Sequence, residues 1–129
     1  TVGASDISGE AVEQAEQNIA ASGLSDVISL TVADFRDLKG MPGGGWLVFN
    51  PPYGERIKPS DIEDLYSAAG STMKHSFPGY QAWILTQGSG LIKSIGLKPR
   101  SKTRLFNGPI ECILAGYELY EGSRKKTAD

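Results

Sequence analysis

The chain has 129 residues, 40% of them hydrophobic and 22% charged, with a net charge of −2 at neutral pH. This length suits one domain, and the charge gives no overall signal for nucleic acid, although a local basic patch could still bind it. The single cysteine, Cys112, and the single histidine, His75, exclude an intrachain disulfide and a Cys/His zinc site, so we expect no metal and a structural role for both. No apolar run reaches about 18 residues, so we expect no membrane span, no membrane partner and a cytoplasmic setting.

The first third of the chain predicts a strand, a helix and a second strand. Residues 1–5 predict a short strand, and because the chain opens inside it without a methionine, we expect a piece of a longer protein. Ser8 is a suitable N-cap for a helix over residues 9–22. Residues 27–32 then predict the second strand, so this part reads as α/β.

The middle of the chain repeats the alternation. The continuous apolar run at residues 46–49 predicts a strand buried on both faces, as in a parallel sheet. The capping-box pattern at residues 60–63 predicts that a helix begins with Ser60 as its N-cap. A strand over residues 80–86 follows that helix.

The last third predicts a short helix and a hairpin. We expect the helix at residues 89–94 and strands at 102–106 and 111–120, with Asn107–Gly108 as a hairpin turn between them. The fold class is therefore α/β, with a mostly parallel sheet and an antiparallel C-terminal hairpin, in one domain over residues 1–120. Residues 121–129 form a polar tail.

Three polar residues follow three of the predicted strands, namely Asp6, Asp34 and Asn50. Ligands of open α/β sheets bind outside the carboxyl ends of the strands. Asp6 could accept hydrogen bonds from a ribose diol, and Asp34 from an exocyclic amine such as that of adenine, with Phe35 against a ring face. Either acid taken alone could equally cap a helix or form a turn. Together they predict a nucleoside pocket.

The sequence "NPPY" follows the strand at residues 46–49 directly. The Asn50 amide offers an acceptor oxygen, and two prolines hold the backbone extended, so the Pro51 carbonyl can be a second acceptor. Such a pair could hold the two protons of a planar amine while Tyr53 stacks on the ring that carries it. The alternative for "NPP" alone is an ordinary turn.

Basic residues occur beside this motif and near the chain's end. Arg56 and Lys58 flank the motif and are candidates for substrate contact. Arg100, Lys102 and Arg104 would share one face of a strand and could line a track for phosphates. A solvated strand face is the alternative.

The sequence resembles a known enzyme family. "NPPY" is typical of class I S-adenosylmethionine-dependent methyltransferases that modify exocyclic amines. The longer run "NPPYGERI", with "SDISGEAVEQAEQNIAASGL", "ADFRDL" and "LFNGPIECIL", is similar to the bacterial 23S ribosomal RNA guanine-N2 methyltransferases that carry a THUMP domain. The resemblance extends from about residue 5 to residue 120.

The resemblance implies a Rossmann-like sheet, S-adenosylmethionine as cofactor, ribosomal RNA as partner, and no metal. It implies that a flipped guanine presents its N2 amine. The cofactor would contact Asp6, Ile7, Asp34, Phe35 and Asn50, and catalysis would involve Asn50, Pro51, Pro52 and Tyr53. The family's first, central strand with its acidic, glycine-rich motif I and its THUMP domain would both precede Thr1, so we expect this piece to be inactive or weak alone.

Two other functions remain open. An adenine-N6 DNA methyltransferase would use the same "NPPY" chemistry, because its target is also an exocyclic amine. A non-catalytic α/β binding module that has lost its cofactor loop is the alternative from another class.

Overall fold

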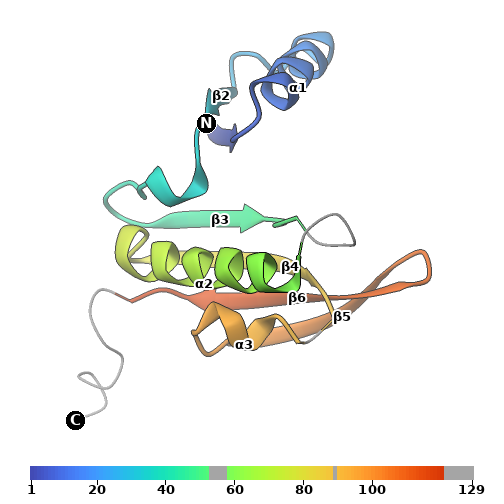
Figure 1. Cartoon of the computed structure of the whole chain (residues 1–129). Coiled ribbons are helices and arrows are strands. Elements are labelled where there is room, and N and C mark those ends of the chain that lie inside the picture. The colour runs from blue at the N-terminus through green and yellow to red at the C-terminus, as the bar shows by residue number, and fades with distance from the viewer. Residues whose placement is uncertain (53–57, 89, 121–129) are drawn as a thin grey trace. The chain divides into compact units, whose positions relative to one another are not determined.

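The computed structural model describes residues 1–52, 58–88 and 90–120. The chain divides into two compact units, Thr1–Leu38 and Lys39–Asp129. Figure 1 shows a helix and short strands in the first unit, and a larger sheet with helices in the second.

The first unit is a small parallel β-α-β arrangement. Strand β1 (Val2–Asp6) pairs in parallel with β2 (Ile28–Val32), and helix α1 (Gly9–Ala21) connects them. The Ser8 hydroxyl accepts a hydrogen bond from the Ala11 amide at 3.2 Å, which confirms the predicted N-cap. A short 3₁₀ helix, η1 (Phe35–Asp37), follows β2.

The second unit is a four-stranded mixed sheet in the order β3-β4-β6-β5. The β3–β4 pair is parallel, whereas β4–β6 and β5–β6 are antiparallel. The α/β class and the antiparallel C-terminal hairpin are therefore confirmed. The elements are β3 (Gly45–Phe49), α2 (Pro59–Ser76), β4 (Tyr80–Gln87), α3 (Ile92–Ile95), β5 (Ser101–Asn107) and β6 (Ile110–Glu118).

One face of this sheet carries the core. Along β4, Ala82, Ile84 and Thr86 are fully buried, because alternate residues of a strand point to the same face. Helix α2 lies over this face and contributes Tyr66 and Met73, which are also fully buried (Figure 1).

The other face of β3 is uncovered. Trp46 and Val48 are 67% and 71% exposed, so the prediction that residues 46–49 are buried on both faces is wrong for the structure as described. The reason is that α2 and α3 cover the opposite face of the sheet (Figure 1), so these two side chains stay largely exposed.

Helix α2 begins earlier than its sequence pattern predicts. Pro59 is the first helical residue, and Lys58 occupies the N-cap position without a side-chain hydrogen bond. The predicted capping box at Ser60 is therefore wrong. Proline is favoured at the first helical position because that position needs no amide donor and suits its fixed φ.

The hairpin turn is shifted by one residue. Asn107 pairs with Ile110, so the two turn residues are Gly108 and Pro109 rather than Asn107 and Gly108. Gly108 has a φ of 61°, a conformation that glycine adopts without steric cost, and proline suits the negative φ at the next position.

The remaining chain-end predictions have mixed outcomes. Helix α3 spans only Ile92–Ile95, whereas residues 89–94 were expected, and Ser89 lies outside the described residues. The predicted tail, residues 121–129, also lies outside them.

Within the part of the chain that the structure describes, no helix has the length and apolar character to cross a membrane.

Candidate functional site

The first unit brings two of the predicted site residues to one edge. Asp6 and Val32 are register partners at the carboxyl ends of β1 and β2, and the Ala33 amide donates to the Asp6 carbonyl at 3.0 Å. Asp34 follows directly. The two acids therefore lie at neighbouring strand ends, on the edge where nucleotides bind in open α/β sheets.

Asp6 is partly engaged within its own turn. Its Oδ1 accepts a hydrogen bond from the Ser8 amide at 2.8 Å, just before α1. This confirms the turn alternative for one of its oxygens, since the N-cap of α1 is Ser8 rather than Asp6. Its Oδ2 accepts no hydrogen bond from the described residues, and the adjacent Ile7 is 67% exposed. A carboxylate with one free oxygen at a strand end remains able to accept from a hydroxyl.

Asp34 is engaged by a residue that the sequence analysis missed, Arg36. The Asp34 Oδ1 accepts from the Arg36 amide at 2.9 Å and from its Nε at 3.0 Å, while Oδ2 accepts from Nη2 at 2.7 Å. Asp34 is thus the N-cap of η1, and Phe35 beside it is half-buried. The two-residue spacing in "DFR" was the available signal, because a side-chain oxygen often binds the amide two residues on.

This contact changes the acidity of the carboxyl group. Hydrogen bonds from the Arg36 side chain and amide lower the pKa of Asp34 to about 2 from a usual 3.8. The ionised form is therefore favoured in the folded state. Its interaction is fully present above pH 3.8 and is lost as the pH falls through about 2.

Substitution of Arg36 tests this assignment. We expect Arg36→Gln to raise the Asp34 pKa from about 2 towards 3.8, because the side-chain hydrogen bonds are its largest cause. The measurement is a carboxyl ¹³C NMR titration. Arg100→Gln is the matched control, since Arg100 pairs with Glu118 instead. An Asp34 pKa that is the same in both variants would contradict the assignment.

The second unit presents Asn50 at the carboxyl end of β3. Asn50 is exposed, and its side chain makes no hydrogen bond with residues 1–52, 58–88 or 90–120. The next residue, Pro51, is buried, whereas Pro52 is exposed. The amide is therefore free to bind a ligand while its neighbour is anchored. Tyr53 and Arg56 lie outside the described residues.

The predicted basic row is only partly formed. Arg100 precedes β5 and pairs at 2.6 Å with Glu118, which belongs to the opposite face from Lys102 and Arg104. The expectation that all three share one face is therefore wrong for Arg100. Arg104 pairs with Glu111 at 3.2 Å. Both pairs are largely exposed, so they contribute little stability.

Lys102 and Lys58 are the less engaged members of the predicted set. Both are exposed, and no ion pair connects either of them with another described residue. Lys58 immediately precedes α2, C-terminal to the NPPY motif in the sequence. Their roles in substrate binding remain predictions.

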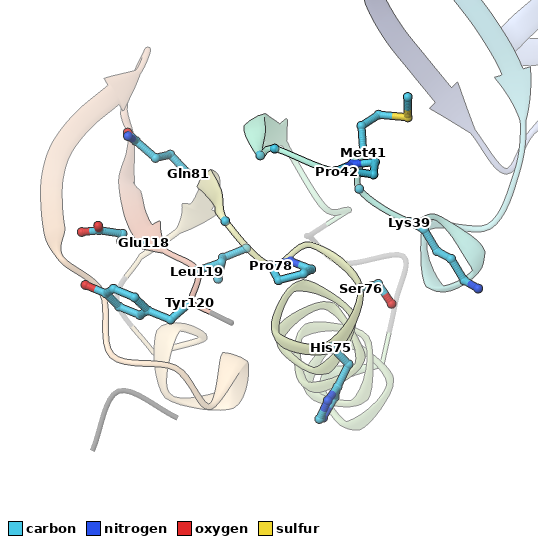
Figure 2. A pocket seen from close by; sticks show the side chains of 14 residues that line it. Lys39, Met41, Pro42, His75, Ser76, Pro78, Gln81, Glu118, Leu119 and Tyr120 are labelled. Atoms are coloured by element: carbon cyan, nitrogen blue, oxygen red, sulfur yellow. The ribbon is translucent and has the colours of Figure 1, made fainter. Parts of the chain in front are cut away.

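An open cavity of about 870 Å³ lies at the opposite edge of the second unit. Figure 2 shows its wall, formed by the segment before β3, the end of α2 and the end of β6, and including Lys39, Glu118 and Tyr120. The segment before β3 is held to the sheet by a hydrogen bond, in which the Tyr80 hydroxyl accepts from the Met41 amide at 2.7 Å. Because it adjoins the amino end of β3, the cavity is separate from Asn50.

The single cysteine and the single histidine lie apart from each other and from any metal-binding group of described residues. Cys112 is buried in β6, as expected for a structural cysteine, and His75 lines the cavity just described. Over residues 1–52, 58–88 and 90–120, no three His, Cys, Asp or Glu side chains form a group that could hold a metal ion.

Comparison with known families identifies one matching domain type. The model described as "RMKL-like, methyltransferase domain" matches residues 1–115. Ribosomal RNA large subunit methyltransferase K/L of Syntrophotalea carbinolica is 33% identical over 117 residues, which are 87% of this chain and 16% of the relative. The protein of that name from Psychromonas ingrahamii is 34% identical over 120 residues, 89% of this chain and 16% of its own. The chain thus spans about one-sixth of these relatives.

Two solved structures have a similar fold. SMU.472, assigned as a methyltransferase and crystallised with SAH, superimposes with a TM-score of 0.86 at 29% identity, over 95% of this chain and 32% of its own. A predicted N6-adenine-specific DNA methylase from Listeria monocytogenes gives a TM-score of 0.76 at 28% identity, over 94% and 30% of the two chains. The predicted methyltransferase-like fold is confirmed.

Proposed function

Because the chain belongs to the family of RMKL-like methyltransferase domains, we propose that it transfers a methyl group from S-adenosylmethionine to an exocyclic amine of a base in RNA. The proposed target is guanine N2 of 23S ribosomal RNA. The relatives' name, ribosomal RNA large subunit methyltransferase K/L, supports RNA as the substrate.

The chain is proposed to act as part of a longer polypeptide. It covers 16% of its K/L relatives and 32% of SMU.472, so those proteins contain much more than this region. In the proposal, the parent supplies the motif I strand and a THUMP domain, and it works in the cytoplasm.

The observation that carries the proposal is the free Asn50 amide at the carboxyl end of β3. Its oxygen and the Pro51 carbonyl would accept hydrogen bonds from the two N–H groups of the target amine, which would orient the nitrogen lone pair towards the methyl group. Pro51 is buried, so the backbone that carries this carbonyl is anchored. Catalysis then rests on alignment rather than on a covalent enzyme intermediate.

The first unit fits part of the cofactor. S-adenosylmethionine, when bound, supplies an electrophilic methyl group on a sulfonium, so the C–S bond breaks as the C–N bond forms, the neutral thioether leaves, and the methylated nitrogen releases one proton to water. Asp6 has a free carboxylate oxygen for ribose hydroxyls, with Ile7 beside it. Asp34 would accept from the adenine amine only if its contact with Arg36 opened or shared an oxygen, and Phe35 would cover the ring.

One other substrate is supported by a specific observation. The Listeria relative is described as a predicted N6-adenine-specific DNA methylase, and adenine N6 is also an exocyclic amine. The same pair of acceptors would hold it. A binding module without activity is the remaining candidate.

The test uses the full-length protein with S-adenosylmethionine and either unmodified ribosomal RNA or unmodified DNA. The products are digested to nucleosides and identified by mass spectrometry. N2-methylguanosine from RNA supports the proposal, and N6-methyladenine from DNA overturns its substrate. No methylation of either favours the binding module.

A further inference from the structure

The β5–β6 hairpin extends beyond the edge of the sheet that carries Asn50. Strand β3 ends where Phe49 pairs with Ile84, and β4 continues to Gln87, which pairs with Cys112. The hairpin strands stay paired for two further residues, as far as Ile110. Figure 1 shows the hairpin end on the same side of this unit as the end of β3 and the start of α2.

This projecting end exposes an aromatic side chain. Phe106 is 65% exposed, and Leu105 and Ile110 on the other face of the hairpin are 41% and 37% exposed. A single exposed apolar residue is common on protein surfaces and needs no explanation. Here, however, the exposed group stands at the projecting end of a hairpin, on the edge where the proposed chemistry takes place.

The same strand face carries positive charge. Lys102, Arg104 and Phe106 alternate along β5, so they point to one face, which is also the face that α2 covers over β4. Glu111 is the register partner of Phe106, and its charge is matched by Arg104 at 3.2 Å. Lys102 has no acidic partner among the described residues, so the row has a net positive charge.

Cations interleaved with an exposed aromatic ring match the chemistry of single-stranded nucleic acid. Such strands are held by basic groups along the phosphates and by aromatic rings on which bases stack. We propose that Phe106 stacks on an unpaired RNA base next to the one that Asn50 holds, while Lys102 contacts the backbone. This inference rests on the proposed function, because flipping a base leaves its neighbours unstacked.

The test measures RNA affinity of the full-length protein by fluorescence anisotropy. The probes are a labelled single-stranded RNA of mixed sequence and an abasic strand with the same sugar-phosphate backbone. We expect Phe106→Ala to weaken binding to the RNA about tenfold, and Phe106→Trp to retain it. On the abasic strand Phe106→Ala should have no effect, whereas Lys102→Ala should weaken binding to both strands and reduce its salt dependence.

Met41→Ala is the matched control, because Met41 is 72% exposed but lies at the opposite edge of the unit. Equal RNA affinity of Phe106→Ala and Met41→Ala would overturn the inference, as would a loss that persists on the abasic strand. Wild-type protein that binds no RNA would also overturn it. If RNA binding depends on Phe106 but no RNA is methylated, the proposed function fails while this surface stands. If Phe106→Ala binds RNA with unchanged affinity and methylates it normally, the inference about Phe106 fails while the proposed function stands.

Discussion

Asn50→Ala is expected to lower kcat of the full-length enzyme at least about 100-fold, equivalent to ~2.7 kcal/mol in the activation free energy. The Asn50 side chain is exposed and makes no hydrogen bond with the described residues, so its removal leaves no internal partner unsatisfied. What is lost is one of the two acceptors proposed to hold the target amine. The loss should therefore appear in kcat while the stability and the affinity for S-adenosylmethionine change little.

Two further variants separate this role from a general effect. Asn50→Asp keeps an acceptor oxygen at the same place, so it should retain more activity than Asn50→Ala. Asn18→Ala removes an exposed asparagine side chain from α1, outside the proposed site, and should leave kcat unchanged. The measurement is single-turnover methyl transfer, which isolates the chemical step. Full activity of Asn50→Ala would rule out the proposed acceptor pair.

The elements with strong local signals could be predicted from the sequence. Ser8 caps α1 because a hydroxyl at that position meets a free amide, and this depends on a few adjacent residues only. The hairpin was found for a similar reason, since a glycine-containing turn separates two predicted strands. The predicted turn, Asn107–Gly108, was one residue too early. Pro109 suits the second turn position, so the turn is Gly108–Pro109 and Asn107 pairs with Ile110.

The errors concern features that depend on tertiary context. Trp46 and Val48 read as doubly buried because an apolar run is typical of a parallel sheet, yet burial is decided by what covers each face. The start of α2 was misplaced because Pro59 competes with a good capping box.

The candidate site was predicted in its positions but not in its contacts. Asp6 and Asp34 do lie at neighbouring strand ends, as a parallel β-α-β pattern requires. The pairing of Asp34 with Arg36 was missed, because it depends on the backbone geometry of a short 3₁₀ turn and on the Arg36 side-chain conformation. Asn50 gives no such conflict, since its amide is free at the predicted strand end.

Gly70→Ala is expected to destabilise the second unit by about 3 kcal/mol, within the upper range for overpacking. A Cβ placed on Gly70 in α2 would lie 1.7 Å from the Ile95 carbonyl oxygen of α3, a distance that no side-chain rotation can relieve because the obstacle is backbone. Alanine favours helix over glycine by up to about 1 kcal/mol, so helix propensity alone predicts the opposite sign. The two helices would have to move apart, and α2 is the element that follows the segment bearing Asn50.

Urea unfolding followed by tryptophan fluorescence would measure this effect, because Trp46 and Trp83 both lie in the second unit. Gly90→Ala is the matched control, since a Cβ on Gly90 meets nothing within 4 Å and its φ is not positive. It should change the unfolding free energy by no more than about 0.5 kcal/mol. If both variants unfold at the same urea concentration, α2 and α3 do not meet at Gly70 as described. If only Gly70→Ala is destabilised, and the full-length protein with this change also loses methyl transfer below its unfolding transition, activity depends on the α2–α3 contact.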